Sequence, residues 1–184
     1  MVTDRKFAAF SKDTGTVPSF RMKAIPAGGL CLSAFLVISR QNSQNVLMGR
    51  LNPDAAWDHL GALDQSRIEA HSKGWMLPSS HLMMDESPQA ASRRIIKEQL
   101  ELDESSINLH DPIVISEVYT PKRFPDLPNH WDIEFIFRGE CNILPKSAAW
   151  SELRYIQVSK TSRQEMARSH EDIVESAGFR FSDS

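Results

Sequence analysis

The chain has 184 residues, a formal net charge of −3 at pH 7, and hydrophobic and charged fractions of 41% and 24%. These values are ordinary for a soluble globular protein, and the length suits one domain with a sizeable core. The small acidic charge provides no electrostatic footprint for nucleic acid and no attraction to an anionic membrane, so neither is an expected partner. Because no signal-peptide pattern or membrane-spanning run is recognisable, the expected compartment is the cytoplasm.

Residues 1–27 mix charged residues with Ser, Thr and Pro and predict an N-terminal arm. Leu30–Ser39 is a near-continuous apolar run, which is typical of a central strand covered on both faces. Val46–Leu51 predicts a second strand, joined to the first by a polar turn. We therefore expect a hairpin at the start of the folded domain.

Residues 52–73 form a longer segment than a simple connection between two elements needs. The segment contains two stretches that could each form a short helix, Asp54–Leu63 and Ser66–His71. We interpret it as a surface insertion, and the alternative is a lid or a dimer contact.

A short strand, a loop and a helix are predicted between Gly74 and Leu102. Trp75–Leu77 is apolar enough for a buried strand, which Pro78 is expected to end. Ser87 followed by Pro88 predicts a helix start, because serine is a preferred N-cap and proline suits the first helical position. The apolar residues beyond it recur at helical spacing: Ala91, Ile95, Ile96, Leu100 and Leu102. A loop that leads into a helix N-terminus presents backbone N–H groups to an anion such as phosphate.

The C-terminal half predicts three strands, a proline-rich loop at 121–128 and one amphipathic helix; the strands are Ile113–Thr120, Trp131–Arg138 and Leu153–Val158. Alternation along the second of these strands places Asp132, Glu134 and Ile136 on one face. The helix is expected at Ser162–Ser176, with Gly178 ending it, and residues 180–184 are expected to form a polar tail.

Two cysteines and six histidines offer little for metal chemistry. Cys31 and Cys141 lie in apolar, strand-like surroundings, where buried free thiols are expected and a disulfide is the alternative. No pair of histidines has the spacing of a zinc motif, so no zinc site is predicted.

The Gly74–Leu102 stretch resembles the Nudix box, the signature loop and helix of hydrolases acting on nucleoside diphosphates linked to another group. In the family pattern a glycine is followed after five residues by Glu, and after seven more by Arg-Glu, an aliphatic residue, any residue, Glu-Glu, any residue, Gly and an aliphatic residue. Aligned without a gap, the matching residues are Leu77, Pro78, Glu86, Arg94, Ile96, Glu98 and Leu102. The departures are Ser80 for the first glycine, Ile95 and Gln99 for two glutamates, and Glu101 for the last glycine.

The resemblance implies an α+β fold, the Nudix fold, with a mixed sheet sandwiched between helices over residues 28–179. It also implies metal-dependent hydrolysis with Mg2+ or Mn2+, in which metal neutralises phosphates and activates water. By residue matching, the catalytic set is Glu86, Arg94 and Glu98. The metal set is Glu98, Gln99 (through its neutral amide oxygen) and Glu134, and no other cofactor is implied.

Several of these residues have a structural alternative. Glu86 and Arg94 can form an ion pair that fixes the loop to the helix. Glu101 can be a solvated charge at the helix end, Glu134 a polar strand residue, and His81 either an anion contact or a surface histidine. Among the tryptophans, Trp131 is the candidate for stacking on a base.

Two functions are suggested by the residues that match the Nudix box and by those that differ from it. The first is a Nudix-type hydrolase acting on a nucleoside diphosphate linked to another group, with weak or altered activity because most metal-binding glutamates are replaced. The second is a non-catalytic Nudix-fold module that binds a nucleotide-like small molecule or a protein partner. The resemblance also suggests a homodimer.

Overall fold

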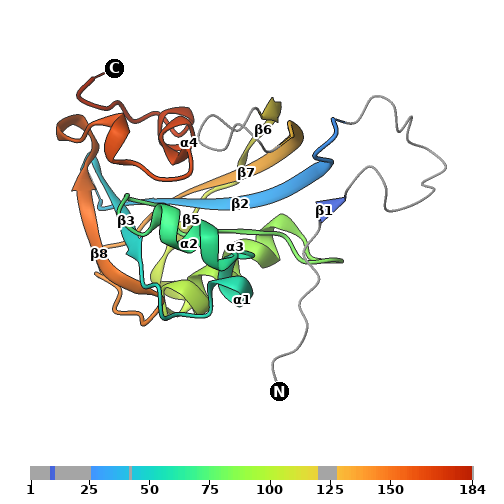
Figure 1. Ribbon diagram of the computed structural model, residues 1–184. Helices are drawn as coiled ribbons and strands as arrows, with labels where there is room; N and C mark the ends of the chain where they lie inside the picture. Colours follow the sequence, from blue (N-terminus) through green and yellow to red (C-terminus); the bar gives the residue numbers. More distant parts are fainter. Residues whose placement is uncertain (1–8, 11–25, 42, 120–127, 184) are drawn as a thin grey trace.

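The computed structural model describes residues 9–10, 26–41, 43–119 and 128–183 (Figure 1). Within these ranges eight strands form one mixed sheet with the path β5-β7-β2-β3-β8, to which β1 and β4 add beside β2, and β6 beside β7. The strands are β1 (Ala9–Phe10), β2 (Leu30–Ser39), β3 (Asn45–Leu51), β4 (Ser79–His81), β5 (Asn108–Leu109), β6 (Ile113–Tyr119), β7 (His130–Glu140) and β8 (Trp150–Gln157).

The helices are α1 (Trp57–Gly61), α2 (Gln65–His71), α3 (Pro88–Gln99) and α4 (His170–Ser176), with 3-10 turns η2 (Glu104–Ser106), η3 (Val158–Lys160) and η4 (Arg163–Glu165). In Figure 1, α4 lies above the sheet, and α1, α2 and α3 lie below it. The predicted α+β architecture, a mixed sheet between helices, is confirmed. In the described part of the chain no helix is long and apolar enough to cross a membrane.

Strand β2 is central because both of its faces are apolar. Leu36 and its neighbours at every second position pack against α3, whereas Phe35 and Val37 pack against the α4 side. Parallel pairing with β7 runs from Leu30 opposite Trp131 to Ser39 opposite Glu140. The near-continuous apolar run at residues 30–39 therefore forms a strand covered on both faces, as the sequence predicts.

Helix α3 begins where local chemistry predicts it. The Ser87 hydroxyl accepts a hydrogen bond from the Ala90 N–H at 3.1 Å, and Pro88 is the first helical residue. Ile95 and Ile96 are buried in the core between α3 and the sheet. This helix lies against β2 and next to β4, so its position is set by the centre of the sheet.

The short strand of this region lies after Pro78 and not before it, so the prediction at Trp75–Leu77 is wrong. Trp75 and Met76 form only isolated bridges, whereas Ser79–His81 pairs with β2. The Pro78 carbonyl still accepts a hydrogen bond from the Leu36 N–H at 2.9 Å. Proline removes a donor but keeps its acceptor, so the chain stays aligned with β2 through the proline.

The C-terminal helix is shorter than predicted. Arg168 and Ser169 have φ angles of 55° and 58°, which break the helix expected over residues 162–176 into η4 and α4. His170 Nδ1 accepts a hydrogen bond from the Leu77 N–H at 3.0 Å, and this contact ties the start of α4 to the box region. The expected inward residues of this segment are buried: Met166, Ile173 and Val174.

Residues 52–73 are part of the packed domain. Trp57 is 1% exposed, and it shares a core with Leu63, Ile68 and Trp150. The Trp57 indole N–H donates to the Ala149 carbonyl at 3.1 Å. Trp57, Leu63 and Ile68 therefore bury as much as the residues of the main core. The role of this segment as an insertion, a lid or a dimer contact stays a prediction.

The domain boundaries also differ from the prediction at the C-terminal end. Phe181 is buried in the core on the α4 side, and the Ser182 N–H donates to the Thr161 carbonyl at 3.1 Å. Packing therefore continues past residue 179 into the expected polar tail. Most of the 1–27 arm lies outside the described residues, but Ala9–Phe10 pairs with Leu30 and Cys31.

Candidate functional site

A buried ion pair holds the loop between β4 and α3. Arg94 Nε lies 2.8 Å from Glu86 Oε1, and Arg94 Nη2 lies 2.8 Å from Glu86 Oε2. The two side chains are only 8% and 6% exposed. A guanidinium and a carboxylate in this two-pronged arrangement form one of the stronger charge-assisted contacts in proteins.

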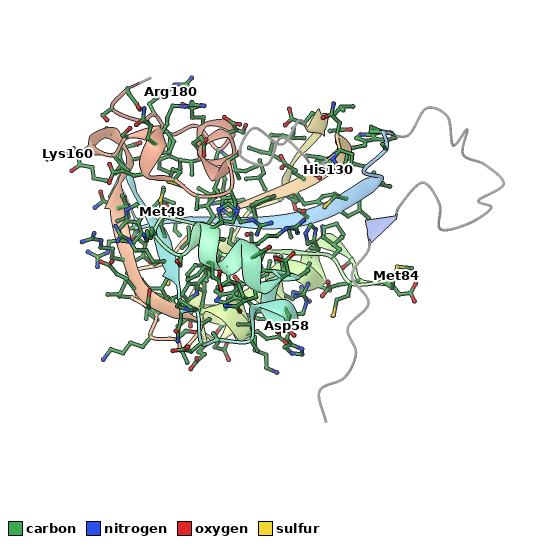
Figure 2. The ribbon with its side chains drawn as sticks, in the orientation of Figure 1. Met48, Asp58, Met84, His130, Lys160 and Arg180 are labelled. Carbon is green, nitrogen blue, oxygen red and sulfur yellow. The ribbon has the colours of Figure 1, made fainter. Side chains whose placement is uncertain are left out.

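The same two side chains also bind the backbone of the loop. Glu86 accepts a hydrogen bond from the Met83 N–H at 2.8 Å. Arg94 donates to the Ser80 hydroxyl at 3.2 Å and to the His81 carbonyl at 2.9 Å. Glu86 and Arg94 are therefore brought together as one clamp, which is the structural alternative that their spacing allowed. Figure 2 shows Met84 projecting outward from this loop, and its side chain is 47% exposed.

Gln99 is a second cross-link in the box, and it is fully buried. Its amide oxygen accepts from the Ser79 N–H at 3.1 Å, and its amide nitrogen donates to the carbonyls of Ser79 and Leu60 at 2.7 and 3.0 Å. Because the amide is satisfied by backbone on both sides, we do not propose Gln99 as a metal ligand. Ile95, one helical turn earlier, is also fully buried in apolar surroundings.

The residues present do not fit a divalent metal held by this loop and helix. No group of three or more His, Cys, Asp or Glu side chains in the described ranges could hold a metal ion. Glu98 is half-buried on α3, on the side of the sheet opposite to Glu134, which shares its β7 face with Ile136. The expected metal set of Glu98, Gln99 and Glu134 is therefore not gathered in one place.

Glu101 occupies the position of the last family glycine and keeps a backbone conformation that favours glycine, with a φ of 52°. Its carboxylate accepts a hydrogen bond from the Ala148 N–H at 3.0 Å, so the side chain binds a neighbouring loop and is not positioned as an additional ligand.

The left-handed conformation at Glu101 predicts a difference between two substitutions. Both Glu101→Gly and Glu101→Ala lose the bond to Ala148, but only alanine keeps a Cβ. We expect Glu101→Gly to be more stable than Glu101→Ala by about 1 kcal/mol in urea unfolding. Equal stabilities would show that the left-handed conformation does not persist in solution.

A polar cluster lies on the α4 side of the sheet, next to the box loop. His81 Nδ1 is 2.8 Å from Cys31 Sγ and 3.2 Å from Ser33 Oγ. The register of β4 on β2, with Ser33 opposite His81, places the three side chains on one face. A narrow pocket beside them is lined by Ser33, Phe35, Gly61, Ser79, Ser80, His81 and Arg168.

The thiol and the imidazole of this cluster are both neutral near pH 7. Burial lowers the pKa of His81 to about 4, and the nearby Arg168 charge adds to the effect. Burial and the Asp132 charge raise the pKa of Cys31 to about 12. Since the thiolate is the nucleophilic form, this pair is not an activated nucleophile. Both cysteines, Cys31 and Cys141, are buried free thiols, as the sequence predicts.

Acidic groups continue the same face onto β7. Burial raises the pKa of Glu134 to about 8, and the charges of Asp132, Glu117 and Asp172 raise it further. Asp132 Oδ2 lies 3.2 Å from His130 Nε2, and Oδ1 is buried with no hydrogen-bond partner in the part of the chain that the structure describes. Figure 2 shows His130 at the start of β7. Glu134 therefore carries a proton over much of the neutral range.

The raised pKa of Glu134 predicts a specific pH dependence of stability. Between its ordinary value of 4.5 and about 8, the folded protein keeps a proton that the unfolded chain has lost. The free energy of unfolding therefore falls as pH rises through this range. Glu134→Gln removes the effect, so relative to the original protein it should gain on the order of 2 kcal/mol at pH 9 and nothing near pH 4.

Glu140→Gln is the matched control for this prediction, because Glu140 is an exposed carboxylate on the same strand and is not among the charges that act on Glu134. Thermal unfolding of both variants from pH 4 to pH 9 gives the measurement. A constant difference between Glu134→Gln and the original protein over that range would refute the raised pKa.

Trp131, the candidate for base stacking, lies on the other face of β7. Its indole N–H donates to the Ser116 hydroxyl at 2.8 Å, and the ring is partly exposed. Trp75 is almost fully buried, with the guanidinium groups of Arg50 and Arg154 at 4.5 and 4.6 Å from its ring centroid. Trp75 is therefore a core residue, and Trp131 is the accessible one of the two.

Solved structures of Nudix proteins share this fold. The MutT protein from Methanosarcina mazei Go1 matches with a TM-score of 0.54 and 16% identity, over 80% of this chain and 91% of that one. An Ap4A hydrolase from C. elegans, in a binary complex, matches with a TM-score of 0.51 and 13% identity, over 79% of this chain and 94% of that one. The Nudix domain of Shewanella oneidensis NrtR, complexed with ADP ribose, matches with a TM-score of 0.50 and 14% identity, over 80% of this chain and 84% of that one.

These likenesses show that the chain has the fold of the Nudix hydrolases, as the box-like stretch predicts. No model of a protein family matches the sequence. No curated protein matches it either. The shared architecture is therefore visible in three dimensions and not in overall sequence similarity.

Proposed function

We propose that this protein uses the Nudix fold to bind a nucleotide-like small molecule, with hydrolysis that is absent or weak. The observation that carries the proposal is the Gln99 amide, which binds Ser79 and Leu60 where the family pattern has a metal-binding glutamate. The clamp of Glu86 and Arg94 keeps the loop in place without a metal ion. The scaffold of the box is thus retained while two of its metal-binding glutamates are replaced, by Ile95 and Gln99.

The fold supports the choice of ligand class. One structure with this fold, the NrtR Nudix domain, is complexed with ADP ribose, a nucleoside diphosphate linked to a second group. Hydrogen-bonding groups from two strands, β2 and β4, lie beside the box loop in this chain, in the buried cluster of His81, Ser33 and Cys31. The narrow pocket beside this cluster is where we propose that polar sugar or phosphate groups of the ligand bind.

Slow hydrolysis of the same class of compound is the second candidate, and Glu134 favours it. A carboxyl group with a pKa of about 8 is suited to exchanging a proton near neutral pH. In that case Glu98, the remaining box carboxylate, contributes to activity, and Glu86 and Arg94 act by positioning the loop. Divalent metal would have to be recruited mainly by the ligand, because the part of the chain that the structure describes offers no gathered set of metal ligands.

Two measurements distinguish these functions. Calorimetric titration with ADP-ribose tests binding, and release of nucleotide or phosphate from a panel of nucleoside diphosphate conjugates, with Mg2+ or Mn2+, tests turnover. We expect binding without measurable turnover. Turnover that disappears in Glu98→Gln would establish the hydrolase instead, and neither binding nor turnover across the panel would overturn the nucleotide proposal.

The partners and the compartment are proposed from the charge and pattern of the sequence. We propose no nucleic-acid partner, because the net charge is −3. A cytoplasmic location is proposed from the sequence alone. A homodimer is also proposed, and its contact surface is argued from the edge of the sheet.

A further inference from the structure

Strand β6 lies at one edge of the sheet. It pairs with β7 on one side, and on its other side no strand pairs with it among residues 9–10, 26–41, 43–119 and 128–183. Such an edge presents a row of backbone N–H and C=O groups that can pair with another strand. Natural proteins usually protect exposed edges with charges, prolines or bulges.

The two edges of this sheet differ in that protection. Strand β8, at the opposite edge, carries the exposed ion pair of Arg154 and Glu152, with N and O atoms 3.2 Å apart. Strand β6 instead exposes Val114 and Val118, which are 56% and 58% accessible. It has no proline, and Glu117 is its sole charged residue. The β6 edge is therefore chemically suited to pairing, whereas the β8 edge is not.

The apolar surface continues from β6 onto β7. Val118 is opposite Trp131, and Val114 is opposite Phe135, so these side chains share one sheet face. Ser116 lies between the two valines and accepts the hydrogen bond from the Trp131 indole. We call Val114, Val118 and Trp131 the β6 patch. It forms a half-exposed apolar strip that ends at the free edge.

We propose that two copies of this chain pair antiparallel through β6, with the two-fold axis passing by Ser116, so that their sheets become continuous. In this register Val114 lies opposite Val118 of the second copy, and the reverse, which extends the apolar strip across the junction. Ile115 lies opposite Glu117 of the second copy. A two-fold contact of this kind uses the same patch on both subunits, as closed dimers do.

The pairing of charges and side chains favours this register over the two registers obtained by moving the axis one residue along β6. Moving the axis to Glu117 places two like carboxylates directly opposite each other, which is destabilising. Moving it to Ile115 places Val114 opposite Ser116 and leaves Val118 outside the paired segment. The axis at Ser116 is the one that matches valine with valine without opposing like charges.

The oligomeric state and one charged substitution test the surface. Light scattering after gel filtration is expected to give twice the chain mass of 20.8 kDa. Val118→Lys is expected to give a folded monomer with an unchanged circular dichroism spectrum, since Val118 is 58% exposed in the single chain. Ile143→Lys is the matched control, because Ile143 is 49% exposed outside the strands and should leave the dimer intact. A monomer at all concentrations would overturn the proposal.

Cysteine cross-linking tests the register. Residues directly opposite in an antiparallel pair have Cα atoms about 4.5–5.5 Å apart, within the range of a disulfide. Ser116→Cys should therefore form a disulfide with its copy under mild oxidation, and Glu117→Cys should not. The original protein is the blank, because its two thiols are buried. Cross-linking of Glu117→Cys and not Ser116→Cys, or a dimer insensitive to Val118→Lys, would overturn the pairing.

Discussion

Arg94→Met is expected to lower the free energy of unfolding by about 3–5 kcal/mol, because it removes the guanidinium from a buried ion pair and leaves the carboxylate charge in the interior. Glu86 is 6% exposed, and its carboxylate also accepts a hydrogen bond from the Met83 N–H. The substitution also removes the bonds to Ser80 and His81 that hold the loop against α3. Urea unfolding gives the measurement.

Arg93→Met is the matched control, because Arg93 is the adjacent residue on the same helix. Its side chain is 63% exposed and pairs with Glu104 at 3.4 Å, so its loss should cost no more than about 0.5 kcal/mol. Adding Glu86→Gln to Arg94→Met should recover part of the loss, since the buried carboxylate charge is then gone. Equal effects of the two arginine substitutions would mean that Glu86 and Arg94 do not form the clamp in solution.

Gln99→Glu is expected to lower stability by about 3 kcal/mol or more without divalent metal, because it buries a carboxylate and removes two donated hydrogen bonds. The new carboxylate would lie beside the carbonyl oxygens of Leu60 and Ser79. A hard cation prefers such oxygen ligands. Mn2+ or Mg2+ should therefore raise the melting temperature of Gln99→Glu and not that of the original protein.

Gln99→Met controls for the lost hydrogen bonds. It should be destabilised and should not respond to metal, because it adds no charge. Ile95 is the other position at which the family pattern has a glutamate. It is left unchanged in this variant, because it is fully buried among apolar groups and a charge there would disrupt that core. If Gln99→Glu is as stable as the original protein, or if metal has no effect on it, this helix face is not the metal face of the box.

Local sequence signals were sufficient for part of the fold. Ser87 and Pro88 set the start of α3 through a cap and a fixed backbone angle, both of which depend on neighbouring residues alone. The apolar run of β2 was recognisable because it lies at the centre of the sheet with both faces covered. The spacing of Glu86 and Arg94 likewise predicted a contact within one loop and helix.

Elements set by distant contacts were not predictable in the same way. Strand β4 begins at Ser79 because the chain pairs with β2 there, and the sequence around Pro78 does not show that pairing. The break at Arg168 and Ser169 is stabilised by the anchoring of His170 to the backbone of Leu77, which is 93 residues away.

The polar cluster was missed for the same reason. Cys31, Ser33 and His81 come together only through the register of two strands that are nearly fifty residues apart. In the sequence His81 is an isolated histidine, whereas the alternation of β2 places Cys31 and Ser33 on one face. A predicted pairing of residues 79–81 with residues 33–35 would have revealed the site.

The box-like stretch of this chain contains residues with two roles, one structural and one in metal binding. Glu86, Arg94 and the buried aliphatic residues hold the loop and helix in place, and they remain. Two of the three residues that would carry negative charge toward a metal are replaced, by Ile95 and Gln99, and Gln99 stabilises the scaffold. The fold therefore persists because its packing and clamp do not depend on the metal.

Calorimetric titration of Mn2+ into the original protein tests this account most directly. We predict no binding site tighter than about 1 mM, which corresponds to about −4 kcal/mol, because donors for a metal are not gathered among residues 9–10, 26–41, 43–119 and 128–183. A single site with micromolar affinity that disappears in Glu98→Gln would contradict the account and would establish a functional metal centre on α3.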